Sequence, residues 1–132
     1  MRNNVGNVGF GLKCSLKSHL DGVRDLMFCK EDNILVTVSE DKTIKLWDTS
    51  LFQKANTHTD LEPYQTLREK NGHIFTITGT SLEQNSHLIF AGGSDGKIKI
   101  WIIRPKIKVE PYSTSQENNF SMMSIPAHKD AI

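Results

Sequence analysis

S-E-D-K-T-I-K-L-W-D, residues Ser39 to Asp48, is the most informative segment of this chain about its fold. Its first four residues favour a tight turn, and the polar and apolar side chains that follow alternate as they do in a half-buried strand. The pattern returns as G-S-D-G-K-I-K-I-W-I from Gly93 to Ile102, where Asp95 and Trp101 each lie 54 positions after the Asp and the Trp of the first stretch. Because residue types and spacing recur together, we expect a repeated structural unit.

Short segments that favour β-structure, separated by polar turns, account for most of the remaining chain. We expect strands at Val23–Phe28, Ile34–Val38, Thr43–Trp47, Tyr64–Leu67, Ile74–Thr78, Leu88–Ala91, Lys97–Ile102 and Phe120–Ile125. In the first of these, Val23, Leu26 and Phe28 are expected to be buried, and the β-branched run Ile34–Val38 is expected to be covered on both faces. These segments predict an all-β fold.

The composition argues against several classes of protein. Sixteen basic and fifteen acidic residues among 132 leave a net charge of +1, so no strong field favours a nucleic-acid partner or a membrane surface. No apolar run approaches the roughly 20 residues of a membrane-spanning helix, so membrane insertion is not expected. The first residues lack the apolar core of a signal peptide, which favours the cytosol or the nucleus; we expect a cytoplasmic location. Cys14 and Cys29 have no C-x-x-C spacing and are expected to be reduced and packed.

The motifs of the first repeat resemble those of the WD-repeat proteins, which form β-propellers. One full repeat is matched by H-x3-V at His19 to Val23, S-E-D at Ser39 to Asp41 and L-W-D at Leu46 to Asp48. Longer stretches resemble the start of the WD-repeat domain of the striatin family: Leu16 to Arg24, Leu35 to Asp48, Leu61 to Tyr64, Ala91 to Gly96, Val109 to Tyr112 and Ala127 to Ala131. The resemblance implies propeller blades of four antiparallel strands, with about two blades present, as a partial WD-repeat propeller.

The resemblance also implies the organisation of the chain. We expect a flexible tail at residues 1–9, an outer strand of a neighbouring or closing blade at 10–18, WD repeat 1 at 19–67, WD repeat 2 at 68–125 and the start of a third, truncated repeat at 126–132. A propeller needs about four to eight blades. We therefore expect that further blades, or self-assembly of several copies, are needed to close the ring.

A Ser, a His and an Asp in the first repeat are the residue types of a nucleophilic triad, so a hydrolase using Ser39 is one interpretation. The resemblance implies a structural hydrogen-bond relay instead. In that relay Asp41 accepts from His19, and His19 contacts the Ser39 hydroxyl. Ser39 in turn meets the indole N–H of Trp47. Buried imidazole and indole groups need such partners, and no G-x-S-x-G elbow accompanies Ser39, so the structural interpretation is favoured.

The second repeat departs from this pattern. Gly93 stands where the relay has Ser39, and Lys70 stands where it has His19. Asp95 and Trp101 alone remain as a partial relay, which predicts a less rigidly braced unit.

Other candidate sites are weaker. The basic run Lys97, Lys99, Arg104, Lys106 and Lys108 allows a nucleic-acid surface, but alternation along a strand gives the same pattern from one solvated face, which we favour. His58, His73 and His87 lack ligand-like spacing, so no metal site is expected. No cofactor motif is present.

A propeller without catalytic groups is usually a platform for other proteins. Similarity to striatins implies a non-catalytic interaction scaffold that assembles signalling complexes containing protein phosphatase 2A and kinases. A WD-repeat adaptor of an unrelated pathway and the Ser39-dependent hydrolase are the alternatives. A partner-binding rim is expected where the chain enters the inner strands, at Asp21, Arg24, Asp25, His73 and Phe75.

Overall fold

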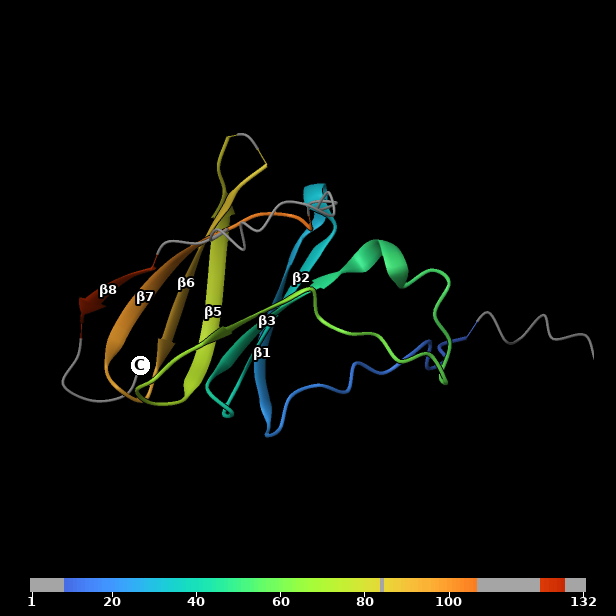
Figure 1. Ribbon diagram of the computed structural model, residues 1–132, viewed down its shortest axis with the longest axis horizontal. Coiled ribbons are helices and arrows are strands. Elements are labelled where there is room, and N and C mark those ends of the chain that lie inside the picture. Colours follow the sequence, from blue (N-terminus) through green and yellow to red (C-terminus); the bar gives the residue numbers. More distant parts are fainter. Residues whose placement is uncertain (1–8, 84, 107–121, 128–132) are drawn as a thin grey trace, which may run out of the picture.

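The chain forms two four-stranded antiparallel sheets in a computed structural model that describes residues 9–83, 85–106 and 122–127 (Figure 1). The first sheet contains β1 (Val23–Cys29), β2 (Ile34–Ser39), β3 (Thr43–Asp48) and β4 (Gln65–Arg68); the second contains β5 (Ile74–Ser81), β6 (His87–Gly93), β7 (Lys97–Ile103) and β8 (Met122–Pro126). Two short 3-10 turns, η2 (Lys30–Asp32) and η3 (Thr49–Leu51), follow β1 and β3. Strand order follows the chain in each sheet, so the predicted all-β fold with two four-stranded units is confirmed.

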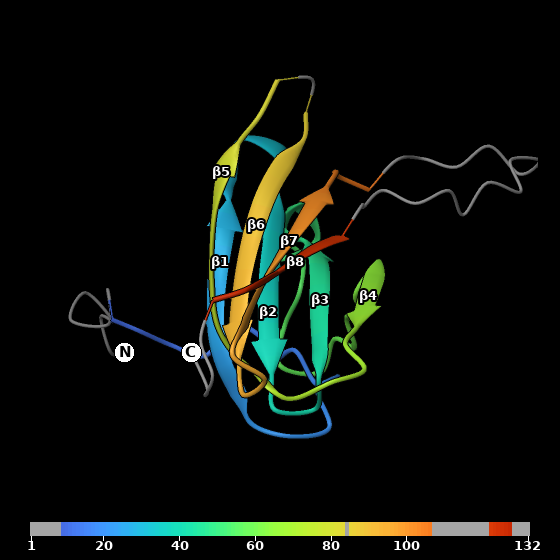
Figure 2. The same ribbon diagram turned by 90° about the vertical axis from the view of Figure 1, so that its left-hand side faces the viewer.

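The two sheets pack face to face. Strand β5 lies against β1 and β2, and Figure 2 shows the second sheet in front of the first with β5 beside β1. One continuous core fills the space between them, contributed mainly by Val36, Val38, Ile44 and Leu46 of the first sheet and Ile77, Ile89, Ala91, Trp101 and Ile103 of the second. Burial of this apolar surface joins the two sheets into one body.

The predicted buried face of β1 is wrong. Val23, Leu26 and Phe28 are more than half exposed, whereas Met27 and Cys29 pack toward the second sheet. Alternation gives two faces but does not say which of them another sheet covers. An irregularity of the β1–β2 register after Val23 further shifts the phase of the strand.

Strand β2 is buried along its whole length, which confirms the prediction that both of its faces are covered. One face meets the core, and the segment that precedes β1 lies on the other, together with the loop that follows η3 (Figure 1). The two coverings are joined where Lys13 Nζ donates to the carbonyl of Gln53 at 2.8 Å.

Residues 9–22 contain no strand, and Phe10 and Leu12 are exposed. The predicted outer strand at 10–18 would need a neighbouring blade to pair with, so it stays a prediction. The tail at 1–8, the start of the predicted strand at Phe120 and most of the expected third repeat lie outside the described residues.

The two repeated turns share one position with a left-handed backbone. Lys42, which follows Asp41 in the β2–β3 turn, has φ of 70°, and Gly96 occupies the equivalent place in the β6–β7 turn with φ of 73°. Glycine adopts this left-handed conformation at no steric cost, whereas lysine does not. The backbone of the first repeat is therefore strained at Lys42.

Candidate functional site

The polar relay of the first sheet is closed by Thr37. His19 Nδ1 lies 2.9 Å from Asp41 Oδ2, and both side chains are only 6% exposed. His19 Nε2 lies 2.7 Å from Thr37 Oγ1, which also accepts the indole N–H of Trp47 at 3.0 Å. With the proton on Nδ1, the imidazole donates to Asp41 and accepts from the Thr37 hydroxyl, so every member has a partner. The relay thus joins the segment before β1 to β2, the β2–β3 turn and β3.

The prediction that Ser39 connects His19 to Trp47 is wrong. Ser39 Oγ instead donates to the carbonyl of Asp21 at 3.2 Å and accepts the N–H of Asp41 at 3.0 Å. Ser39 is fully buried and these two contacts brace the turn, so the triad interpretation lacks its Ser–His contact. A signal was present in the sequence, because Thr37 is the hydroxyl residue inside the β-branched run Ile34–Val38.

Asp41 is the electrostatic centre of the relay. Burial alone would raise the pKa of Asp41, but hydrogen bonds from the Thr43 hydroxyl, the Leu20 N–H and His19 outweigh it and lower the pKa to about 2. The Thr43 hydroxyl donates at 2.5 Å, and the Leu20 N–H donates at 2.9 Å. Asp41 is therefore ionised throughout the neutral range, as an acceptor that holds the turn.

The second sheet replaces the relay with a buried ion cluster. Lys99 Nζ lies 2.6 Å from Asp95 Oδ2 and 2.9 Å from Glu69 Oε2, and it donates to the carbonyl of Asn71 at 3.3 Å. Burial alone would raise the pKa of Asp95, but hydrogen bonds from Lys99 and the N–H of Lys97 hold it below its ordinary value. The predicted partial relay of Asp95 and Trp101 thus omitted Lys99, the residue that engages Asp95.

This cluster also corrects the interpretation of the basic run. Lys99 is 7% exposed and occupied by two carboxylates, so the lysine face of β7 is not solvated there. Lys97 begins β7 and Arg104 follows its other end, which places them at opposite ends of the sheet. Lys108 lies outside the described residues. The described cations of this basic run therefore form no continuous strip.

A second polar set lies between the sheets. His87 of β6 is buried, and its Nε2 lies 2.5 Å from Asp32 Oδ2 in η2, while its Nδ1 lies 3.3 Å from Ser81 Oγ. The contact between His87 and Asp32 ties the second sheet to the first. Tyr64 adds another tie, because its hydroxyl donates to the carbonyl of Arg104 at 2.9 Å.

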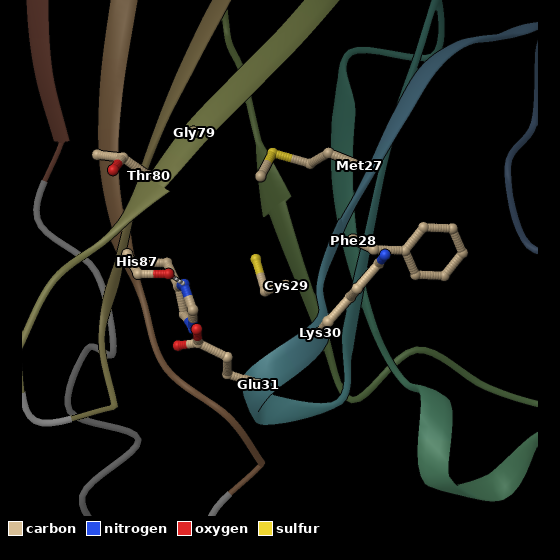
Figure 3. Close-up of a pocket in the computed structure, with 9 residues that line it drawn as sticks. Met27, Phe28, Cys29, Lys30, Glu31, Gly79, Thr80 and His87 are labelled. Atoms are coloured by element: carbon tan, nitrogen blue, oxygen red, sulfur yellow. Dashed lines mark hydrogen bonds between the residues drawn. The ribbon is translucent and has the colours of Figure 1, made fainter.

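A pocket of about 260 Å³ opens beside this contact (Figure 3). Cys29 and His87 line it, whereas the Phe28 ring points away. Burial and the charge of Asp32 raise the pKa of the Cys29 thiol to about 11, which keeps it neutral and unreactive. Among the described residues, no three His, Cys, Asp or Glu side chains are grouped closely enough to hold a metal ion.

The structure brings three of the predicted rim residues together. Arg24 Cζ lies 5.5 Å from the centre of the Phe75 ring, and the His73 ring stacks on Phe75 with centroids 6.3 Å apart. Asp25 instead serves the contact between sheets, since its Oδ2 accepts the N–H of Ile77 at 2.9 Å. Asp21 is exposed, and its carboxylate accepts the N–H of the next residue.

Comparisons with known proteins agree with this geometry. The family model for the WD domain, G-beta repeat, matches residues 10–48 and 62–101. Over 122 residues, which are 91% of this chain, the chain is 38% identical to Striatin-3 of Mus musculus and 33% identical to Striatin-4 of Homo sapiens. It is also 33% identical to Striatin of Rattus norvegicus over the same length. The aligned part spans only 15% to 16% of these relatives. No helix within the described ranges is long and apolar enough to span a membrane.

Proposed function

The chain belongs to the WD40 repeat family, and from this premise we propose that it is a non-catalytic, striatin-like scaffold in the cytoplasm. It assembles signalling complexes that contain protein phosphatase 2A and kinases. The observation that carries the proposal is that the side chains capable of catalysis in the first repeat are occupied in structural hydrogen bonds. His19, Asp41 and Thr37 are all engaged in holding strands together. Arg24, His73 and Phe75 instead lie together at the end of the sheets where β1 and β5 begin.

The outward sheet faces support a role within a larger ring. On the first sheet, Leu26 and Phe28 are about half exposed. The face of the second sheet that points away from the first carries half-buried apolar side chains, namely Leu88, Phe90, Ile98, Ile100 and Ile102. The exposed side chains of β1 and the outward face of the second sheet therefore suit further blades or other copies of this chain, whereas the outward face of β2 is covered by the segment before β1.

The proposal is tested by direct binding. The 132-residue chain is immobilised, and binding of the purified phosphatase 2A core is measured by interferometry, followed by binding of an associated kinase. Saturable binding is expected, and it should be lost when Thr37→Val and Trp47→Phe together weaken the fold. A folded chain that binds neither the phosphatase nor the kinase would leave a WD-repeat adaptor of another pathway.

Catalysis is tested on the same material. Ser39→Ala is expected to lower stability. Neither the unmodified chain nor this variant is expected to show hydrolytic activity. A hydrolytic activity that Ser39→Ala abolishes without changing stability would overturn the non-catalytic assignment.

A further inference from the structure

Three loops meet at the end of the sheets where β1 and β5 begin. The N–H of Glu69 donates to the carbonyl of Lys42 at 2.9 Å, which brings the loop before β5 to the β2–β3 turn. His73 then joins both neighbouring turns, since its N–H donates to Ser94 Oγ at 2.7 Å and its ring contacts the carbonyl of Glu40. Side chains from both sheets therefore share one rim.

This end of the structure carries a surplus of exposed positive charge. We use the name basic rim for Arg24, Lys42, Arg68, Lys70, His73, Phe75 and Lys97. In this set Arg24, Lys42, Arg68 and Lys70 are exposed, and Lys97 is partly exposed. Arg68 pairs with the residue that follows Lys42, so these cations are neighbours rather than scattered charges.

The acidic groups at the same end are mostly occupied. Asp41 is held by His19 and Asp25 by the backbone of β5. Glu69 and Asp95 share the single positive charge of the buried Lys99, and both carboxylates are largely withdrawn from solvent. In the described part of the chain, Asp21 and Glu40 are left to oppose the cations, whereas the opposite end mixes Lys30, Arg104 and Lys106 with Glu31, Asp48 and Glu83.

Arg24 is the best-placed cation of the set. Its side chain is 51% exposed and lies over Phe75, and a single contact of 3.5 Å to Glu40 Oε1 leaves guanidinium donors for a ligand. A guanidinium held over an aromatic ring loses little freedom on binding and presents a planar pair of N–H groups that fits a carboxylate. Since the His73 ring stacks with the same Phe75 ring and His73 is fixed from two turns, the anchor is organised in advance.

We propose that the basic rim binds an acidic segment of a partner protein, with one carboxylate on Arg24 and further acidic side chains over Lys42 and Lys70. The inference rests on the proposed scaffold function and adds the chemistry of the partner. A protein segment suits the rim better than a nucleic acid. Asp21 and Glu40 interrupt the cations, which suits the spaced carboxylates of a protein segment better than a continuous phosphate backbone. The net charge of the chain is also only +1.

The test measures fluorescence anisotropy of a short labelled peptide rich in glutamate on the full 132-residue chain. The comparison probes are the same peptide with glutamine at those positions, the peptide with phosphoserine, and a short DNA duplex. We expect the glutamate peptide to bind roughly tenfold more tightly than the glutamine peptide. Its binding should weaken as the salt concentration rises from about 0.01 M to about 0.15 M, because the Debye screening length shortens from about 30 Å to about 8 Å.

Matched variants locate the site. Arg24→Gln with Lys42→Gly and Lys70→Gln should weaken binding by roughly tenfold or more, whereas Lys30→Gln with Arg104→Gln and Lys106→Gln removes the same charge at the opposite end and should change nothing. Lys42→Gly also relieves a left-handed backbone, so it does not endanger folding. A further variant, Arg24→Lys, keeps the charge but loses the planar fork and should weaken binding by itself.

Several outcomes would overturn the inference: equal affinity for the glutamate and glutamine peptides, equal losses in the two triple variants, or tighter binding of the phosphoserine peptide or the DNA duplex. If the acidic peptide fails while the unmodified chain still binds the phosphatase 2A core, the basic rim is refuted and the scaffold function stands. If the peptide binds and the phosphatase does not, the proposed partner is refuted and the rim stands.

Discussion

Thr37→Val is the substitution that probes the relay most sharply. Valine has nearly the volume of threonine, so it leaves no cavity, but it removes the hydroxyl shared by His19 Nε2 at 2.7 Å and Trp47 Nε1 at 3.0 Å. Two buried polar groups then lack a partner, each at a cost of roughly 1–3 kcal/mol. We expect the free energy of unfolding to fall by about 2–6 kcal/mol. Ser39→Ala removes turn contacts alone and should cost about 1 kcal/mol.

Urea unfolding followed by circular dichroism and tryptophan fluorescence measures both variants, with the midpoint compared at constant slope. Thr37→Ser is the control because it keeps the hydroxyl. Thr37→Val and Trp47→Phe should be non-additive by about 1 kcal/mol because they remove two ends of one hydrogen bond. An effect of Thr37→Val no larger than that of Ser39→Ala would refute the relay as described.

Three further predictions follow from the turns and from the contact between the sheets. Lys42→Gly should raise the free energy of unfolding by about 1 kcal/mol, measured by urea unfolding, because lysine is strained at a φ of 70°. The pKa of Asp41 is lowered from 3.8 to about 2, so its contribution to stability is complete above about pH 4 and is lost as the pH falls toward 2. Unfolding over this range should show a steeper loss in the natural chain than in Asp41→Asn. His87→Ala leaves the carboxylate of Asp32 without its imidazole and should cost about 3 kcal/mol by thermal or urea unfolding; a change below about 0.5 kcal/mol would mean that the contact does not hold the sheets together.

Local patterns predicted the strands well because each strand is short and its turns carry strong signals. The repeated Asp and Trp placed β3 and β7 correctly, including their pairing with the strands before them. The choice between the two faces of β1 failed, since Val23, Leu26 and Phe28 differ little in apolar character from Met27 and Cys29. Which face is buried depends on where β5 lies, and that is tertiary information.

The polar sites failed for a related reason. Thr37 and Ser39 lie on the same face of β2, two positions apart, and spacing does not say which hydroxyl meets His19. Lys99 belongs to an alternating pattern typical of a solvated strand face, yet it is buried because Glu69, thirty positions earlier, reaches it from the loop before β5. Ion pairs between distant segments leave no local pattern in the sequence.

Light scattering behind size exclusion, with circular dichroism on the same peak, measures whether this chain supplies two blades of a larger ring. Because apolar side chains lie exposed on β1 and on the outward face of the second sheet, we expect the folded chain to elute as an assembly with a mass that is a multiple of 14.9 kDa. A folded, monodisperse particle of 14.9 kDa would contradict it, because the outward faces would then need no further blade.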